Sequence, residues 1–495
     1  MKGVKIMGTA SSGEWIAILL YFALVIGVGV YFFFRDRNVE GEKEYFLGGR
    51  SMGGWVAALS AGASDMSAWV LMGLPGSIYL YGIGKVWIAV GLVIGTICAW
   101  VFVAPRLRRY SIRANDSITI PQFLTNRFQS KNKGLQIISA IVFVVVYCIY
   151  SASSISACGT LFNTVTGMSA KTAMIIATAI ILVYVFLGGF NAVCWTDFFQ
   201  GMLMLGALLI APIFALFMLQ GMGIHAVDTP HYFNAFSSWK DIVSGLGWGL
   251  GYFGMPHIII RFMSLESQKS LKKSAKIGIT WTVLIVIFAA AVGIIGRLFL
   301  GYDEAINGHS LVFITMVRKI FPGVISGLLL SAVLAASMST ADSQLLMAAS
   351  AFASDVYKPV FRKGKASDKE MMWAGRIVVL IISVVALIIA SNPNSGTIMS
   401  LVSNAWGVFG AAFGPVILLS LFWKRFTFAG AVAGIVVGAA VDGLWLAFLS
   451  GTGIYEIIPA FAASMIAAIV ASLLSKKPGK DVEELFDKAV KFEEE

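Results

Sequence analysis

The chain has 495 residues, of which 58% are hydrophobic and only 13% are charged. Soluble domains carry about 25% charged residues, so this composition, with its repeated apolar runs, indicates a membrane protein that crosses the bilayer many times. The net charge of +11 does not indicate nucleic-acid binding, because the basic residues lie in short loops and form no basic domain. The four cysteines lie in or beside apolar runs, so we expect packing thiols and no disulfides.

Thirteen apolar segments are long enough to span a bilayer, so the predicted fold is an all-α, polytopic membrane protein with 13 transmembrane helices. The segments lie at about residues 14–34, 52–81, 86–105, 136–164, 171–190, 198–220, 240–262, 276–300, 322–350, 372–391, 398–422, 427–449 and 455–475. Most of the 37 lysines and arginines, Arg261 among them, lie in loops on one side, which makes that side cytoplasmic. Because the number of segments is odd, we expect the N-terminus outside and the C-terminus inside the cell.

Segments two to six and seven to eleven form two sets of five helices, and an odd number per set inverts one set relative to the other. The first helix of each set is interrupted, at residues 60–67 and in the glycine-rich stretch 245–257. Breaks at matching places in two halves indicate a transporter binding site. We therefore divide the chain into six parts. They are a first helix with a cytoplasmic loop (1–51), a first repeat (52–220), an external loop (221–239), a second repeat (240–422), two flanking helices (423–475) and a cytoplasmic tail (476–495).

The first break contains Asp65, and the small residues around it favour local unwinding of the helix. A carboxylate in mid-membrane costs several kcal/mol unless it is compensated, and unwound backbone survives there only where it lines a cavity or is buried in protein. We expect the ninth segment to face this break and to bring the Ser339 and Thr340 hydroxyls near the carbonyls freed around Ala63 and Met66. Such an all-oxygen cage suits a hard cation such as sodium, although small residues and hydroxyls also serve helix packing.

The second break carries aromatic residues that suit a small amphipathic solute. Trp248, Tyr252 and Pro256 recur at helical spacing, so they share one face if the segment is helical. The alternative is aromatic residues that face lipid or pack against other helices. Tyr150 could also reach the cavity, and the acids Asp197 and Asp342 could belong to an ion site or cap helices at the surface. No P-loop or HExxH motif is present and we expect no nucleophile elbow, so we expect a secondary transporter and not an enzyme.

Several segments of the chain resemble the sodium/solute symporter family, and in particular its proline-transporting branch. They are Tyr-Phe-Leu-Gly-Gly-Arg-Ser at 45–51, Ala-Leu-Ser-Ala-Gly-Ala-Ser-Asp-Met-Ser at 58–67, Leu-Met-Gly-Leu-Pro-Gly at 71–76, Gly-Trp-Gly-Leu-Gly-Tyr-Phe-Gly at 247–254 and Phe-Gly-Ala-Ala-Phe-Gly-Pro at 409–415. The resemblance runs over about residues 14–475. It implies a five-plus-five inverted repeat of the leucine-transporter type with flanking helices, and sodium-coupled uptake of L-proline across a bacterial cell membrane.

The resemblance also implies roles for individual residues. Sodium would be held by the carbonyls of Ala63, Met66 and Ala336 and the hydroxyls of Ser339 and Thr340, and coupling would depend on Asp65 and Arg50. The residues that match the substrate pocket are Ser67, Trp69, Gly73, Tyr150, Trp248, Tyr252 and Pro256. Some relatives bind a second sodium at positions that match Asp197, Asp342 and Ser343, and here Asp342 replaces a serine.

Sodium is the one cofactor that we expect, and the partners are L-proline, sodium and the lipid bilayer, with no nucleic acid and no obligate protein partner. The alternatives are a family member that carries pantothenate, a monocarboxylate or a sugar, and a proton-coupled carrier in which Asp65 and Asp342 titrate.

Overall fold

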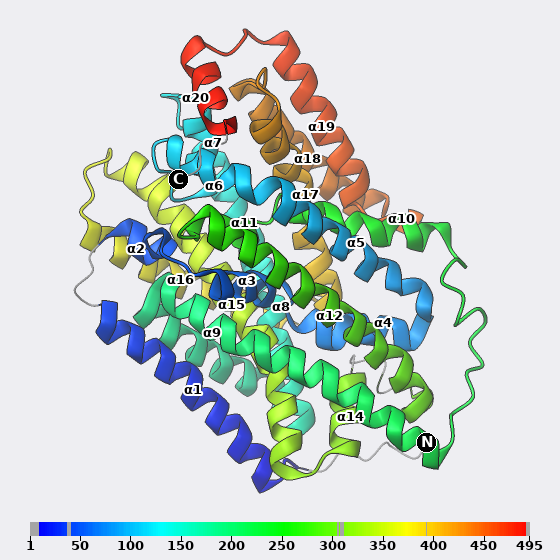
Figure 1. The fold of residues 1–495 in the computed structure, drawn as a ribbon. Coiled ribbons are helices and arrows are strands. Elements are labelled where there is room, and N and C mark those ends of the chain that lie inside the picture. The colour runs from blue at the N-terminus through cyan, green and yellow to red at the C-terminus, as the bar shows by residue number, and fades with distance from the viewer. Residues whose placement is uncertain (1–8, 37–40, 304–305, 307–310, 393, 492–495) are drawn as a thin grey trace.

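The computed structural model describes residues 9–36, 41–303, 306, 311–392 and 394–491, and this part of the chain is helical and contains no strand. The helices pack side by side as an inclined bundle (Figure 1). Most of them are rich in apolar side chains, which suits helices of a bundle that crosses a bilayer. The described chain has ten helical stretches long and apolar enough to cross a membrane.

These ten stretches comprise single helices and some continuous runs of shorter elements. They are α1 (Ser12–Asp36), a run of η3 (Ile83–Lys85), α5 (Val86–Cys98), η4 (Ala99–Val103) and α6 (Ala104–Arg113), then α8 (Gly134–Thr166), α9 (Ala170–Met222), α12 (Gln268–Leu300), α15 (Gly323–Phe352) with η6 (Ala353–Phe361), α16 (Asp368–Ser391), α17 (Ile398–Phe422), α18 (Phe428–Phe448) and α19 (Ile457–Leu474). The shorter elements between them are α2 (Glu42–Leu47), η1 (Gly48–Arg50), α7 (Ile120–Arg127), α14 (Val312–Ile320), η7 (Ser450–Thr452) and α20 (Lys480–Val490).

The expected count of 13 transmembrane helices is not confirmed. It treats α9 as two segments, and it counts two interrupted segments that contain no single long helix. The 53 residues of α9 would extend about 80 Å as one straight helix, more than twice the apolar thickness of a bilayer. The helix departs from helical geometry at Gly189, where φ is 57° and ψ is −154°. The count of 13 therefore stays a prediction.

The first interrupted segment comprises α3 (Gly54–Asp65), the five-residue η2 (Trp69–Gly73) and α4 (Leu74–Tyr81). The chain leaves helical geometry at Met66, where φ is −82° and ψ is 72°. The break follows a run of small residues with low helix propensity, as the sequence predicts. The segment is buried along almost its whole length, so protein and not lipid surrounds the irregular backbone.

The second interrupted segment comprises α10 (Trp239–Gly247), the 3₁₀ turns of η5 (Trp248–Phe253) and α11 (Pro256–Ser264). Its glycines are required by close packing against α17. A Cβ atom on Gly251 would lie 2.0 Å from Trp406 Nε1, and one on Gly254 would lie 2.3 Å from the Phe409 carbonyl oxygen. The irregular backbone can therefore approach α17 only because these positions carry no side chain.

The core of the bundle is α15, which packs against α1, α3, α8 and α9. The two flanking helices α18 and α19 pack against each other and against α17, at the top of the view in Figure 1, whereas α1 lies at the opposite edge. The first interrupted segment packs on α15 through α3, and the second packs on α17 and α19 through η5. This arrangement places both breaks inside the protein.

We expect Gly254→Ala to lower the midpoint of thermal unfolding of the purified protein, because the new methyl group overlaps the Phe409 carbonyl. Overpacking of this kind costs about 1–3 kcal/mol. The matched control is Gly443→Ala in α18, where a Cβ meets no atom within 4 Å and the helix gains from the lost glycine flexibility. Equal midpoints for the two variants would contradict the close packing of the second break on α17.

Candidate functional site

Asp65 joins the two interrupted segments. Its side chain is 1% exposed, and one carboxylate oxygen accepts a hydrogen bond from the Tyr252 hydroxyl of η5. The other oxygen, Oδ1, has no hydrogen-bond partner among the described residues. The indole N–H of Trp69 donates to the Asp65 backbone carbonyl over 3.3 Å. A buried carboxylate with an open oxygen is an electrostatic site for a positive charge.

One hydroxyl of α15, that of Ser339, reaches the end of α3, as the sequence predicts. Ser339 Oγ lies 2.8 Å from the Ala63 carbonyl oxygen and 3.2 Å from that of Ala336, and Thr340 Oγ1 lies 3.1 Å from the latter. All of these residues are fully buried. Met66 follows three residues after Ala63, and its non-helical backbone takes its carbonyl out of the helical pattern. The Ser339 hydroxyl therefore meets the Ala63 carbonyl near the end of α3, whereas the Thr340 hydroxyl bonds within α15. Neutral oxygens of this kind suit an alkali cation.

Four aromatic rings surround the second break. The Trp248 ring lies 5.9 Å from Trp69, 6.1 Å from Trp406 and 5.1 Å from Tyr455, measured between ring centroids. Trp248 is only 5% exposed, so the alternative in which it faces lipid is wrong. The Tyr455 hydroxyl donates to the Ser403 carbonyl over 2.8 Å, which fixes its ring on Trp248. Stacked rings of this kind bind apolar ring faces, and the indole and hydroxyl groups can orient a polar solute.

The remaining predicted substrate residues lie around the same place. Ser67 occupies the first break. Gly73 lies one turn from Trp69, and a Cβ atom on Gly73 would lie 3.3 Å from Met399 Sδ. Tyr150 of α8 is fully buried, with its ring 5.9 Å from that of His257. Pro256 begins α11 directly after the second break. The structure therefore brings residues of α3, α8, η2, η5 and α11 together.

A buried ion pair lies one helical turn from the cage. Arg261 Nη2 is 3.1 Å from Asp197 Oδ2, and the two side chains are 1% and 0% exposed. The same guanidinium donates to the Ser343 hydroxyl over 2.5 Å, and Ser60 donates to Asp197 over 2.7 Å. The prediction that Arg261 belongs to a cytoplasmic loop is wrong, because it lies in the last turn of α11 and points into the bundle. Four helices therefore meet at this pair.

Asp342 takes no part in that ion pair. Its carboxylate accepts a hydrogen bond of 2.7 Å from the Tyr184 hydroxyl of α9. Both Asp197 and Asp342 are fully buried, so the alternative in which they cap helices at the surface is wrong. The three residues that match a second sodium site, Asp197, Ser343 and Asp342, thus lie on two neighbouring helices, but the first two bind a guanidinium.

Arg50 lies outside the membrane-spanning helices and ties the first loop to two other segments. Its guanidinium lies 2.9 Å from Asp116 Oδ1 and donates to the carbonyls of Met263 and Ser117 over 2.5 and 2.7 Å. Burial lowers the pKa of Arg50, and the charge of Asp116 opposes this effect. Burial alone would raise the pKa of Asp116, but hydrogen bonds and charges from Lys43 and Arg50 hold that pKa below its usual value. Both groups are therefore charged at neutral pH, and the loop is fixed to the end of α11.

Two residues of this region carry no signal that reasoning from the sequence could use. Tyr455 comes from the short connection between α18 and α19, far along the chain from the two breaks. Arg261 follows a long apolar stretch and looks like the first residue of a basic loop. The buried position of each depends on packing between distant helices.

A family model described as the sodium:solute symporter family matches residues 45–438. The chain belongs to this symporter family. Among its relatives, the high-affinity proline transporter PutP of Bacillus subtilis is 44% identical over 470 residues, which cover 93% of this chain and 98% of that protein. The osmoregulated proline transporter OpuE of Bacillus subtilis is 42% identical, covering 95% and 96%. The sodium/proline symporter of Staphylococcus aureus is 43% identical, covering 96% and 97%.

Solved structures confirm the predicted leucine-transporter-type fold of this symporter. A Na+-coupled sialic acid symporter aligns with a TM-score of 0.77 at 19% identity, covering 95% of this chain and 99% of that one. The transporter MhsT in complex with L-phenylalanine aligns with a TM-score of 0.53 at 15% identity, covering 85% and 97%. As a symporter-family member, the chain is a transport protein and not an enzyme.

We expect Asp197→Asn to destabilise the symporter strongly, because Arg261 then stays buried without its ion-pair partner. Breaking a buried pair in this way costs about 3–5 kcal/mol. The double variant Asp197→Asn, Arg261→Met removes both charges, so it should unfold at a higher temperature than Asp197→Asn alone. Thermal unfolding of the detergent-purified protein, followed by tryptophan fluorescence, measures the difference.

The control for this comparison is Lys424→Gln, which removes one member of an exposed pair with Asp487, whose side chains are 41% and 50% exposed. Exposed pairs contribute at most about 1 kcal/mol, so this midpoint should change little. A double variant less stable than Asp197→Asn would contradict the assignment of Arg261 as the counter-charge.

Proposed function

We propose that this symporter takes up L-proline together with sodium across a bacterial cell membrane. The observation that carries the proposal is the contact between Ser339 of α15 and the Ala63 carbonyl where α3 breaks, beside an Asp65 that Tyr252 of the second break holds. A cation bound at the first break and a solute bound at the second would therefore both contact the place where the two breaks meet. The relatives at 42–44% identity, which are named as proline transporters, support the substrate.

Sodium would bind between the Ala63, Met66 and Ala336 carbonyls and the Ser339 and Thr340 hydroxyls. In the structure the hydroxyls already donate to these carbonyls. A cation would take over the carbonyls, and the hydroxyl oxygens would turn their lone pairs to it. Because these oxygens belong to α3 and α15, the ion would hold the two helices together. The negative charge of Asp65 nearby would favour a cation over a neutral molecule.

Proline would bind against Trp248 and Tyr252, with Trp69, Tyr150, Ser67, Gly73 and Pro256 around it. The apolar pyrrolidine ring suits an aromatic face, and the ammonium-type charge of the zwitterion suits the carbonyl-rich break and the aromatic rings. The carboxylate would take N–H groups at the start of the helix that resumes with η2, as anions do at the N-termini of broken transporter helices. We further propose that Tyr455 covers the substrate through its stacking on Trp248.

We infer that one sodium ion accompanies each proline. Arg261 supplies a fixed positive charge to Asp197 and Ser343, so these residues need no second cation. One sodium that crosses a membrane potential of 100 mV releases about 2.3 kcal/mol, and a tenfold sodium gradient adds about 1.4 kcal/mol. Together they would support accumulation of a neutral zwitterion by roughly several hundred-fold. With the N-terminus outside and the C-terminus inside, the basic loops would face the cytoplasm.

A second candidate is proton coupling, which the unpartnered Oδ1 of the buried Asp65 favours. In that case a proton and not sodium would neutralise the carboxylate. We expect radiolabelled proline uptake into reconstituted vesicles to follow an imposed inward sodium gradient and to stay low with a proton gradient alone. Uptake driven equally by protons without sodium would favour the second candidate. If unlabelled proline did not compete with the labelled uptake but another solute did, the assignment of proline as the substrate would be contradicted.

The two half-sites can be separated by a crossed pair of variants. Ser339→Ala with Thr340→Ala removes both hydroxyl ligands, so sodium stimulation of uptake should fall at least tenfold. Trp248→Ala removes the aromatic platform, so we expect the concentration of proline for half-maximal uptake to rise at least tenfold, with a smaller change in the sodium concentration for half-maximal stimulation. The measurement is initial uptake rate against each ligand. Equal changes in both constants for both variants would show that the residues pack and do not bind.

A further inference from the structure

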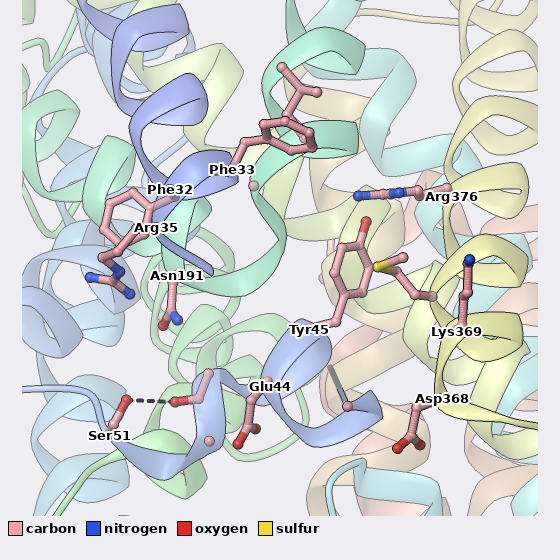
Figure 2. Close-up of a pocket in the computed structure, with 16 residues that line it drawn as sticks. Phe32, Phe33, Arg35, Glu44, Tyr45, Ser51, Asn191, Asp368, Lys369 and Arg376 are labelled. Atoms are coloured by element: carbon pink, nitrogen blue, oxygen red, sulfur yellow. Dashed lines mark hydrogen bonds between the residues drawn. The ribbon is translucent and has the colours of Figure 1, made fainter. Parts of the chain in front are cut away.

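A cavity of about 530 Å³ lies far from the two breaks, where α1 ends and α16 begins (Figure 2). Its walls come from the last turn of α1, from α2 and η1, from the bent part of α9 and from the first turns of α16. Figure 2 shows Arg376 at the upper side of the view and Lys369 at its right, with Glu44 and Asp368 at the lower side. The cavity therefore has two basic groups of α16 at one end and acidic groups at the lower side, and Arg35 lines it at the left of the view.

The cationic end comes from one face of α16. Lys369, Met372 and Arg376 line the cavity and recur at i, i+3 and i+7 on that helix, so they share a face. Within the described part of the chain, no carboxylate lies in ion-pair distance of Lys369 or Arg376. The Arg376 side chain is buried, and its Nε has no hydrogen-bond partner there. A buried cation without a counter-charge favours an anionic ligand.

Aromatic rings hold the Arg376 guanidinium in place. Its carbon Cζ lies 5.8 Å from the ring centre of Tyr45, 5.0 Å from that of Phe186 and 5.2 Å from that of Trp373. Cation–π contacts of this kind orient the planar group but leave its N–H groups able to bind an anion. A phosphate between Lys369 and Arg376 would meet both charges.

The rim of the cavity carries exposed apolar side chains. Phe32 and Phe33 of α1 line the cavity, and the neighbouring Phe34 is 60% exposed. On α16, Trp373 and Ile377 next to Arg376 are 46% and 54% exposed. Both helices pack against α9. Arg376 lies eight residues into α16, about 12 Å from its start, so it lies deeper along that helix than Lys369.

We propose that this cavity binds the headgroup of an anionic phospholipid that also carries hydroxyl groups, with phosphatidylglycerol as the model ligand. The phosphate would bind Lys369 and Arg376, the glycerol hydroxyls would donate to Glu44 and Asp368 at the other end, and the acyl chains would leave along the exposed apolar side chains. Basic pockets between transmembrane helices at a membrane surface bind lipid headgroups for the same reasons. The inference does not depend on the transported solute.

A lipid at this place would touch the segments that fix the first loop. Asn191 lines the cavity just after the bend at Gly189, and a Cβ on Gly189 would lie 2.8 Å from the Tyr45 ring. Gly49 lines it directly before Arg50, which binds the end of α11. Occupancy would therefore hold α2 and η1 against the bend of α9.

The test is native mass spectrometry of the full chain, purified in detergent and supplied with phosphatidylglycerol or phosphatidylcholine. We expect the wild type to retain one phosphatidylglycerol in preference to phosphatidylcholine, and Lys369→Gln with Arg376→Gln to need at least tenfold more lipid for the same occupancy. Lys369→Gln alone removes an exposed side chain and keeps the buried Arg376, so it tests the site if the double variant does not fold. The matched control is Lys365→Gln, an exposed lysine outside the cavity, which should retain the lipid.

Equal retention by the variants and the control, or equal retention of the two lipids by the wild type, would overturn the proposal. A second arm adds inorganic phosphate or glycerol phosphate at millimolar concentration. If either displaces the lipid and binds with the same affinity as phosphatidylglycerol, the site recognises a soluble phosphate and not a lipid. Lipid retention is measured without transport, so its failure and a failure of the proposed proline uptake are distinguishable.

Discussion

The structure depends on how an interrupted helix satisfies its backbone where no water is available. A helix that stops in the middle of a bilayer exposes carbonyl and N–H groups that lipid cannot bind. In this chain the end of α3 is met by α15, whose Ser339 hydroxyl binds the Ala63 carbonyl, and by η5, whose Tyr252 hydroxyl binds Asp65. The break is therefore stable only while both neighbours are in place. The same dependence makes it a suitable site for an ion that replaces one of those contacts.

The buried charges follow the same logic. Asp65, Asp197 and Asp342 each accept hydrogen bonds from a different helix, through Tyr252, Arg261 and Tyr184. The Arg261–Asp197 pair also draws in Ser60 of α3 and Ser343 of α15. Since a charge that loses its partner in the bundle costs several kcal/mol, helices linked in this way move together. We infer that α3, α9, α11 and α15 behave as a unit near this pair, and that rearrangement during transport is concentrated at the aromatic side of the breaks.

The fold and much of the site could be predicted from the sequence because their signals are local. The stretch at 60–67 combines small residues with one acid, and the stretch at 245–257 combines glycine with proline, so each announces a break inside an apolar segment. The buried positions of Tyr455 and Arg261 could not be predicted. Tyr455 lies in a connection between flanking helices and Arg261 near the end of an apolar segment, and the sequence of such a place is similar whether it faces water or protein. The number of transmembrane helices cannot be read from the sequence for a related reason. The bend at Gly189 interrupts α9 without a polar loop, so apolar length alone does not decide between one helix and two.

The first loop links the central site to the edge of the bundle. Tyr45, Gly48, Gly49 and Ser51 line the peripheral cavity, and Arg50 of the same loop binds the Met263 carbonyl at the end of α11. Arg50 adopts a positive φ of 57°, a conformation that non-glycine residues rarely take and that neighbouring contacts must enforce. Those contacts are the ion pair with Asp116 and the carbonyls of Met263 and Ser117. Because α11 also carries Arg261, a change in the conformation of this loop alters the end of the helix whose other end lines the proposed substrate site. The coupling role that the resemblance implies for Arg50 would therefore need no direct contact to sodium or solute.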